Sequence, residues 1–384
     1  MSAPRRILIP LTTRGNYAKM KSTFRAAARR TDLDVSIVVG GGIVRERFGD
    51  FRARLTADGF AIAATLDFLV DDGATPVAQA RSSAAAIGAF AALSAATKPD
   101  AVLLIADRYE TLAFATAATC LALPIAHLEG GEVSGSIDER IRHATTKLAH
   151  FHLPANADAA ERIRRMGEPA DRIAVVGSPS LDLIADIDLS DTRAIAAAGP
   201  GEGDAIDFRA PYAVVSQHPV VGEHDAAAAQ IAETLAAVDA LGLPVAILLP
   251  NMDAGGAAIV AEIGRWRPAA KVPARVWPSM PMEAYATLLT GAACLIGNTS
   301  SGLREGAFLG VPAVNVGSRQ TGRARAANVA DAPPERGAIL AAARRQVAHG
   351  RYPRDTLYGD GNAGEKITEA LATMPLDLDK PIVY

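Results

Sequence analysis

The chain has 384 residues, of which 49% are hydrophobic and 21% charged, and this composition excludes a disordered protein. A chain of this length predicts two domains, each able to bury a core of its own. The formal net charge of -3 and the aromatic content of 5% argue against a nucleic-acid surface and favour a small-molecule protein.

In the first half of the chain, short β-rich runs alternate with helical patterns, which predicts a parallel sheet with right-handed crossovers. The predicted strands are residues 6–11, 35–39, 101–106, 124–128, 151–154 and 173–176. The predicted helices are residues 17–30, 82–96, 111–121 and 137–150. Ser136 and Glu139 have the spacing of a capping box at the start of the last helix.

Residues 186–211 interrupt this alternation, because Gly, Pro and Asp are dense there, and they are predicted to link two domains. Beyond them, the predicted strands are residues 212–217, 245–249, 275–277, 294–297 and 313–316, and the predicted helices are residues 225–241, 255–264, 282–290 and 300–309. The predicted fold class is α/β, with two doubly wound Rossmann-like domains facing a cleft. Residues 1–185 form the first domain, joined by a C-terminal helix within 364–384, and residues 212–363 form the second.

The apolar run 7–11 is too short for a secretory signal, and the Ala-rich run 83–96 is too short to span a membrane. Cys120 and Cys294 lie in apolar stretches, where we expect small core residues and neither a disulfide nor a metal site. We therefore expect a cytoplasmic protein with no nucleic-acid or membrane partner.

Acidic residues follow two of the predicted strands. Asp107 comes directly after 101–106, and Glu129 comes directly after 124–128. Ligands of open parallel sheets bind beyond the carboxyl ends of the strands, so two carboxylates there predict acid–base chemistry. Asp138 is a third candidate, although the dipole of the helix that it begins would favour a carboxylate by itself.

His218 ends a strand of the second half, and Pro219 keeps it out of the helical region. There it could act as an acid, a base or a phosphate ligand, while a purely structural histidine is the alternative. The other histidines do not have metal-ligand spacing, so no metal is predicted.

Thr299 and Ser300 lie where a strand passes into a predicted helix, a position suited to binding a phosphate. Glu305, about one turn later, could accept hydrogen bonds from a ribose; the alternative is that Asn298 or Thr299 only caps the helix. Arg319 is predicted to contact a diphosphate.

Arg14 follows the first strand and is predicted to contact phosphate or sugar, with a surface arginine as the alternative. Glycines 40–42 do not have the spacing of the dinucleotide fingerprint, which disfavours a NAD-dependent dehydrogenase.

The motifs, in this order, resemble the hydrolysing UDP-N-acetylglucosamine 2-epimerases, which supply N-acetylmannosamine for sialic acid. The resemblance runs over nearly the whole chain and is strongest in Ala106-Asp-Arg-Tyr-Glu110, His127-Leu-Glu-Gly-Gly-Glu-Val-Ser-Gly-Ser-Ile-Asp138, Ile141-Arg-His-Ala-Thr-Thr-Lys-Leu-Ala-His150, Gly177-Ser-Pro-Ser-Leu-Asp182, Gln217-His-Pro219, Pro250-Asn-Met-Asp-Ala-Gly-Gly256 and Asn298-Thr-Ser-Ser-Gly-Leu-Arg-Glu305. It implies the GT-B architecture, a homodimer or homotetramer, a nucleotide-sugar substrate and no cofactor.

Carried over residue by residue, the resemblance implies that the acid–base group is Asp107, Glu129, Asp138 and His218. The implied substrate contacts are Arg14, Arg108, Thr299, Ser300, Glu305 and Arg319. The implied reaction eliminates UDP across C1 and C2 of the sugar and then adds water, which inverts C2. Which carboxylate serves as base and which as acid stays open.

Two positions depart from the family pattern. Its usual Arg-Ala-Asp-Tyr is Arg14-Gly15-Asn16-Tyr17 here, and its usual Gly-Met-His-Leu is Gly40-Gly41-Gly42-Ile43. We expect both positions near the sugar, where they would make room for a bulkier or differently substituted one. The alternative substrates are therefore a UDP-diacetamido or a GDP-linked sugar of legionaminic-acid-type pathways. A GT-B glycosyltransferase and a non-catalytic binder are the alternatives from other classes.

Overall fold

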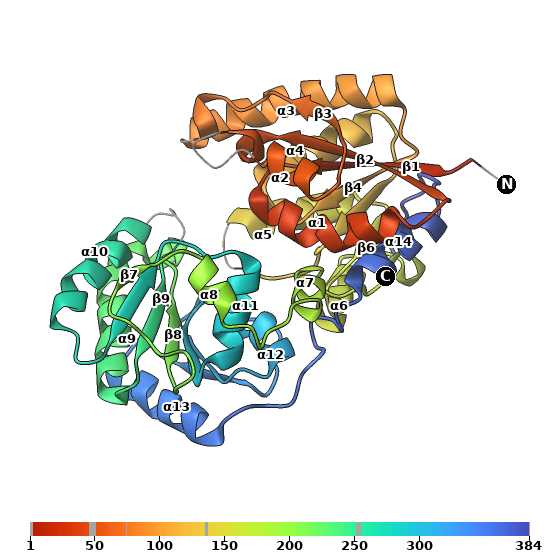
Figure 1. Cartoon of the computed structure of the whole chain (residues 1–384). Coiled ribbons are helices and arrows are strands. Elements are labelled where there is room, and N and C mark those ends of the chain that lie inside the picture. Colours follow the sequence, from red (N-terminus) through yellow and green to blue (C-terminus); the bar gives the residue numbers. More distant parts are fainter. Residues whose placement is uncertain (1–2, 46–50, 74, 135–136, 251–254, 384) are drawn as a thin grey trace. The chain divides into compact units, whose positions relative to one another are not determined.

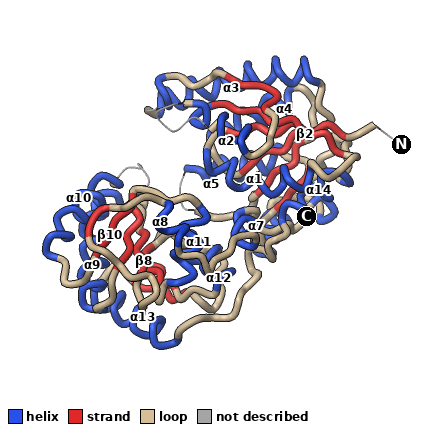
Figure 2. The backbone as a smooth tube through the Cα atoms, viewed as in Figure 1, coloured by secondary structure: helices blue, strands red, loops and turns tan. Residues whose placement is uncertain are grey.

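The computed structural model describes residues 3–383 except 46–50, 74, 135–136 and 251–254. The chain divides into two compact units: unit 1 is Met1–Asp182 with Gly359–Tyr384, and unit 2 is Leu183–Tyr358. Each unit has one sheet with helices packed on it (Figure 2). The prediction of an α/β fold with two Rossmann-like domains is confirmed.

Unit 1 has a six-stranded parallel sheet in the order β3-β2-β1-β4-β5-β6, so the winding reverses between β1 and β4. Its elements are β1 (Arg5–Leu11), α1 (Arg14–Ala27), β2 (Leu33–Gly40), η1 (Gly41–Val44), α2 (Arg52–Ala57), β3 (Ile62–Leu66), η3 (Asp71–Gly73), α3 (Pro76–Thr97), β4 (Ala101–Ile105), α4 (Tyr109–Cys120), β5 (Ile125–Leu128), α5 (Ile137–Leu148), β6 (Phe151–Leu153), α6 (Ala157–Arg165), η4 (Ala170–Arg172), α7 (Ser180–Ala185, which crosses into unit 2) and α14 (Ala363–Thr373).

Both faces of this sheet are buried, which explains why its strands are apolar at nearly every position. Ile7, Ile9 and Leu11 of β1 belong to one core cluster, together with residues of α1 and α14. Leu8 points the other way and belongs to the cluster that contains residues of α3 and α4. Figure 1 shows α3 along one face of the sheet and α1 beside α14 on the other.

Unit 2 repeats this winding in a seven-stranded sheet of order β13-β12-β11-β8-β9-β10-β7, in which the reversal falls between β8 and β11. Its elements are α8 (Arg193–Ala197), β7 (Glu202–Gly203), β8 (Ala213–Ser216), η5 (Val221–Ala226), α9 (Ala227–Leu241), β9 (Val245–Leu248), α10 (Gly256–Trp266), η6 (Arg267–Ala269), β10 (Ala274–Trp277), α11 (Met282–Gly291), β11 (Cys294–Gly297), η7 (Ser300–Gly302), α12 (Glu305–Leu309), β12 (Ala313–Val316), β13 (Val329–Ala332) and α13 (Arg336–His349).

The segment 186–211, predicted as a linker, belongs to unit 2 instead. Its β7 adds an antiparallel edge to β10, and Ile195 of α8 is buried in the core cluster beside α11. Gly201 has a φ of 62° and lies so close to the Trp277 ring that a Cβ atom would be 2.7 Å from it. Some of the glycines read as linker residues therefore serve close packing.

Two other local predictions differ from the structure, and a third falls on a residue outside the described part of the chain. Residues 173–176 run beside β6 but form only an isolated bridge, between His152 and Ile173. The helix expected over 300–309 is divided into η7 and the five-residue α12. Ser136, the expected capping residue, lies outside the described residues, and Glu139 accepts a hydrogen bond from the Ser134 N–H at 2.7 Å.

The return of the chain into unit 1 is fixed by Asp182. Its two carboxylate oxygens accept hydrogen bonds from the N–H groups of Ala363 and Gly364, at 2.9 and 2.7 Å, in the first turn of α14. Gly364 packs directly on α1, where a Cβ atom would lie 2.7 Å from the Ser22 carbonyl carbon. A carboxylate distant in sequence thus caps the helix that closes unit 1.

Replacing Asp182 by Ala should destabilise unit 1 by about 2 kcal/mol, because two buried N–H groups lose a charged acceptor. The matched control is Thr75→Ala, which removes the N-cap hydrogen bond of α3 and should cost about 1 kcal/mol. Urea unfolding followed by circular dichroism measures both. Equal effects of the two substitutions would contradict the role given to Asp182.

The C-terminal segment after α14 is held by a buried charge cluster. Glu168 accepts hydrogen bonds from His152, Lys147 and Lys380, and Lys380 also donates to the Ala149 carbonyl oxygen. Burial alone would raise the pKa of Glu168, but these hydrogen bonds outweigh it and lower the pKa to about 2. The cluster therefore stabilises the folded protein when Glu168 is ionised.

Because the folded pKa of Glu168 lies below its ordinary value of 4.5, the unfolded chain binds the proton first. The contribution of this group is complete above pH 4.5 and is lost as the pH falls toward 2. Glu168→Gln should remove this component of the acid dependence of unfolding. Glu161→Gln is the control: the pKa of Glu161 is also about 2, but its side chain is 40% exposed against 1% for Glu168, so high salt should screen its effect and not that of Glu168.

Candidate active site

The acids predicted in unit 1 lie where two adjacent strands end. β4 and β5 are parallel neighbours, with Ile105 opposite Leu128, and Asp107 and Glu129 follow within two residues. Ala106 and Glu129 have φ angles of 58° and 59°, in the left-handed region that side chains disfavour. Such conformations cost about 1–3 kcal/mol each and are enriched at functional sites, although Asp71, Asp72, Lys98 and Ala122 adopt them elsewhere in this chain.

His127 supports the turn after β4. Its Nε2 lies 2.8 Å from the carbonyl oxygen of Ala106, which can only accept, so Nε2 carries the proton. Nδ1 is then the acceptor for the Thr146 hydroxyl at 3.2 Å. Burial lowers the pKa of His127 to about 4, so the imidazole is neutral at physiological pH. We infer that His127 holds the strained peptide next to Asp107.

Glu129 is 3% exposed and is paired with a lysine. Its Oε2 accepts from Lys19 Nζ, on α1, and its Oε1 accepts from the Ser178 hydroxyl at 3.1 Å. The Ser178 hydroxyl also lies 3.1 Å from that of Ser180. A buried carboxylate is tolerated only with such partners, and these two also fix its orientation.

Asp107 is held in the same way by Arg142 of α5. The Arg142 guanidinium contacts Asp107 Oδ2, donates to the Glu132 carbonyl oxygen at 2.6 Å and donates to the Ser134 hydroxyl at 3.2 Å. Arg142 is 2% exposed whereas the Asp107 side chain is 26% exposed. The carboxylate therefore combines a fixed position with access to a ligand.

The other predicted residues of unit 1 are more exposed. Asp138 lies in the first turn of α5 and is exposed, and its charge acts on Arg108. Arg108 donates through Nε and Nη2 to Glu110, at 3.1 and 3.2 Å, so part of its guanidinium already serves the fold. Arg14 begins α1, and its guanidinium carbon lies 5.8 Å from the centre of the Phe51 ring.

Asn16, one of the two departures from the family pattern, has a structural task. Its Oδ1 accepts from the N–H groups of Thr12 and Thr13, both at 3.2 Å, and from the Thr12 hydroxyl at 3.1 Å. The Asn16 N–H is in turn capped by the Thr13 hydroxyl. A carboxylate would accept the same bonds, so the amide preserves the turn between β1 and α1.

In unit 2, His218 follows β8, and Arg319 follows β12. Burial and the positive charge of Arg319 lower the pKa of His218 to about 4. A neutral imidazole can accept a proton, but it cannot begin a reaction at neutral pH as a general acid. Arg319 Nη1 donates to the Asn298 carbonyl oxygen at 3.1 Å.

The predicted phosphate site after β11 differs from the sequence expectation. Thr299 caps the short η7 by accepting from the Ser301 N–H at 3.3 Å, and Ser300 is the first residue of η7. Glu305 is buried at the start of α12. Burial raises the pKa of Tyr285, whose hydroxyl bonds the side chains of Ser301 and Thr299. With only five residues in α12, the hydroxyl groups matter more than a helix dipole here.

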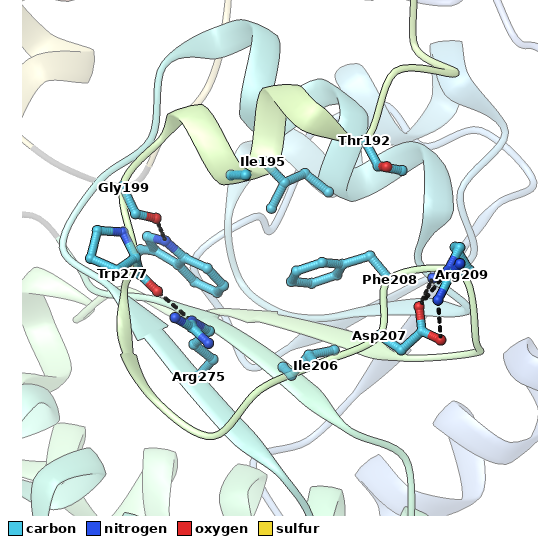
Figure 3. Close-up of a pocket in the computed structure, with 11 residues that line it drawn as sticks. Thr192, Ile195, Gly199, Ile206, Asp207, Phe208, Arg209, Arg275 and Trp277 are labelled. Carbon is cyan, nitrogen blue, oxygen red and sulfur yellow. Dashed lines mark hydrogen bonds and ion pairs between the residues drawn. The ribbon is translucent and has the colours of Figure 1, made fainter.

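A pocket of about 380 Å³ lies elsewhere in unit 2 (Figure 3). Phe208 and Trp277 form part of its wall together with Ile195 and Ile206, and Asp207 pairs with Arg209 beside them. No predicted site residue lines it. Among the described residues, no three His, Cys, Asp or Glu side chains gather in a way that could hold a metal ion.

The sequence matches the UDP-N-acetylglucosamine 2-epimerase family over residues 25–372. The chain belongs to this family. It is 34% identical over 380 residues, 97% of each chain, to the UDP-N,N'-diacetylbacillosamine 2-epimerase (hydrolyzing) of Legionella pneumophila. It is 28% identical to the UDP-N-acetylglucosamine 2-epimerase of Neisseria meningitidis, over 93% of this chain and 92% of that one.

The fold agrees with this family. The crystal structure of UDP-GlcNAc 2-epimerase from Neisseria meningitidis bound to UDP-GlcNAc superposes with a TM-score of 0.77 at 15% identity, covering 95% of this chain and 99% of that one. The GT-B-like architecture implied by the sequence motifs is thus confirmed. Within the described residues, no helix is long and apolar enough to cross a membrane.

Two site residues were missed in the sequence. Lys19 lies five residues after Arg14 in the predicted helix, and Arg142 lies four residues after Asp138, on the next turn of α5. Arg142 was open to recognition as a cation one helical turn from a predicted site residue, whereas the five-residue spacing of Lys19 from Arg14 gives no such signal. Residues 251–254 of the Pro250–Gly256 motif and residues 135–136 lie outside the described residues.

Lys19→Met should lower kcat by roughly 100-fold, because Glu129 loses the cation that fixes its orientation. Lys21→Met is the control, since Lys21 lies on the same helix and pairs with Asp58 at 2.9 Å. Steady-state kinetics with the nucleotide sugar that the wild-type protein turns over gives kcat for both variants. Equal activity of the two variants would remove Lys19 from the site.

Proposed function

We propose that this protein is a hydrolysing 2-epimerase. It converts UDP-N-acetylglucosamine, or a closely related nucleotide-linked acetamido sugar, to the free N-acetylmannosamine-type sugar and the nucleoside diphosphate. The observation that carries this proposal is the pair of carboxylates, Asp107 and Glu129, at the ends of neighbouring strands, each held by a buried or half-buried cation. Family membership supports the substrate class.

The first step is an elimination. A carboxylate removes the proton from C2, the C1–O bond breaks, and the nucleoside diphosphate leaves as the C1–C2 double bond of a 2-acetamidoglucal forms. The C2 proton is weakly acidic, so the departing diphosphate must be stabilised by positive charge. We assign this task to Arg14, Arg108 and Arg319, and we assign binding of the nucleotide to Thr299, Ser300 and Glu305.

The second step is a hydration. Water adds its oxygen to C1, and a proton is returned to C2 on the face opposite to the one from which it was taken. The sum is one nucleotide sugar and one water giving one inverted sugar and one nucleoside diphosphate. Asp107, Glu129, Asp138 and His218 supply the proton transfers. Because the pKa of His218 is about 4, it is neutral at physiological pH and acts first as an acceptor.

A second substrate is favoured by one observation. One relative, 34% identical over 97% of both chains, is named for UDP-N,N'-diacetylbacillosamine, whereas another, 28% identical over 93% of this chain, is named for UDP-N-acetylglucosamine. Gly42 stands where the family usually has a histidine, and we propose that the missing side chain accommodates an additional acetamido group. UDP-linked diacetamido sugars are therefore the second candidate, with GDP-linked ones beside them.

Incubation with each nucleotide sugar in deuterated water, followed by NMR, tests the proposal. We expect free sugar with deuterium at C2 together with the nucleoside diphosphate. Release of sugar without deuterium would instead mean simple hydrolysis. Release only after addition of an acceptor would mean a glycosyltransferase, and binding without release would mean a non-catalytic binder.

Asp107→Asn should abolish turnover and leave binding of the nucleoside diphosphate within about threefold, because a proton-transfer group is lost without a change of shape. Asp100→Asn is the matched control: Asp100 precedes the same strand, at its other end, and binds Arg6. NMR measures turnover of the nucleotide sugar by each variant, and calorimetry measures binding of the nucleoside diphosphate. An active Asp107→Asn variant would exclude Asp107 from the proton transfers.

A further inference from the structure

A glycine lies where the two central strands of unit 2 end. β8 and β11 pair in parallel, and Ser216 is opposite Gly297 in the last pair. Gly297 has a φ of 136°, and a Cβ atom on it would lie 2.2 Å from the Ser216 carbonyl oxygen. The winding of the sheet reverses between these two strands, which is where open α/β sheets bind their ligands.

Beyond this pair, the side chain of Asn298 makes the hydrogen bonds that the main chain of a strand would otherwise make. Its Oδ1 accepts from the N–H of His218 at 2.7 Å, and its Nδ2 donates to the carbonyl oxygen of His218 at 2.8 Å. The amide thus acts as a peptide group would in a strand. Pro219, the next residue, has no N–H with which to continue the strand pairing. The Asn298 side chain hydrogen-bonds both the N–H and the carbonyl oxygen of His218.

The main chain of Asn298 holds a third loop, the one after β12. Its carbonyl oxygen accepts from Arg319 Nη1 at 3.1 Å and from Gln320 Nε2 at 2.7 Å. Asn298 is 1% exposed, so these contacts are made in a water-excluded environment where they are stronger. One residue therefore connects the ends of β8, β11 and β12.

We propose that Asn298 is a positioning residue, whose side chain fixes the main chain of His218 while its carbonyl oxygen fixes the loop that carries Arg319. The imidazole and the guanidinium then meet the sugar nucleotide in one arrangement. This inference rests on the proposed function, because it gives His218 and Arg319 a shared substrate. It replaces the simpler reading of Asn298 as a helix cap, a task that Thr299 performs.

The hydrogen bonds of Asn298 also keep the His218 imidazole near the positive charge of Arg319. Arg319 acts on the imidazole from the loop after β12, while Glu223 of η5 accepts from the Ser318 hydroxyl next to Arg319. His224 of η5 lies 3.5 Å from Asp225 and forms a separate pair. If His218 is released from its half-buried position beside Arg319, water can solvate the imidazolium and the pKa of His218 must rise.

Asn298→Ala tests the proposal. We expect kcat to fall roughly 100-fold, because displacing a proton-transfer group by about 1 Å has effects of that size. We expect KM for the nucleotide sugar to change less than about threefold, since the carbonyl oxygen that holds Arg319 remains. The pKa of His218, followed by NMR of labelled histidine, should rise from about 4 toward its ordinary value of 6.5.

Gln346→Ala is the matched control. Gln346 is also a buried amide of unit 2, and its Nε2 donates to the carbonyl oxygens of Ala313 and Asn328, both at 2.8 Å, near the amino end of β12. This variant should leave the pKa of His218 and kcat unchanged. A similar loss of kcat in Gln346→Ala would overturn the proposal in favour of general loosening of unit 2.

An Asn298→Ala variant with unchanged kcat and an unchanged His218 pKa would also overturn it. Should that variant fail to fold, Asn298→Asp measured at pH 8 keeps the shape and the acceptor and removes the donor to the His218 carbonyl oxygen. A wild-type protein that turns over no nucleotide sugar would refute the proposed function. The His218 titration would still decide whether Asn298 positions His218.

Discussion

A parallel sheet brings the carboxyl ends of all its strands to one edge, and both units of this protein depend on that constraint. In unit 1 it places Asp107 and Glu129 on neighbouring turns after β4 and β5. In unit 2 it places His218 and Asn298 after β8 and β11. Residues that are far apart in the sequence become neighbours at these edges without any special feature of the intervening helices.

Charge burial sets the second requirement. Glu129 and Arg142 are almost completely buried, and an unpaired charge in either place would cost several kcal/mol, about 3–5 when one partner of a buried pair is removed. Lys19 and Asp107 supply the missing charges, from α1 and from the end of β4. The helices that cover the sheet therefore provide both its core and the counter-ions of its acids.

Left-handed backbone at Ala106 and Glu129 adds strain at the same edge. The imidazole of His127 and the Lys19 ion pair offset that strain, because each holds one of the two turns in place. We assign a corresponding positioning role in unit 2 to Asn298, with an amide in place of an imidazole. In unit 1 a neutral imidazole and two cations position the groups to which we assign chemistry, and in unit 2 we assign this task to a buried amide.

The sequence predicted local features of the fold and the site better than it predicted contacts between distant segments. Apolar runs ending in Asp107, Glu129 and His218 predicted the strands and the edge at which these residues lie, because a buried parallel strand needs apolar side chains on both faces. The motifs likewise identified the family. The spacing of short motifs along one chain carries this information without any knowledge of distant contacts.

Tertiary structure alone decided the partners. Lys19 meets Glu129 across 110 residues, Asp182 caps a helix 181 residues later, and Asn298 clamps His218 across 80 residues. It also drew residues 186–211 into unit 2, since composition cannot tell a glycine that packs against Trp277 from one that frees a linker. Hydrogen bonds and ion pairs between distant segments depend on how the strands are ordered in the sheet, and that order is a property of the folded chain.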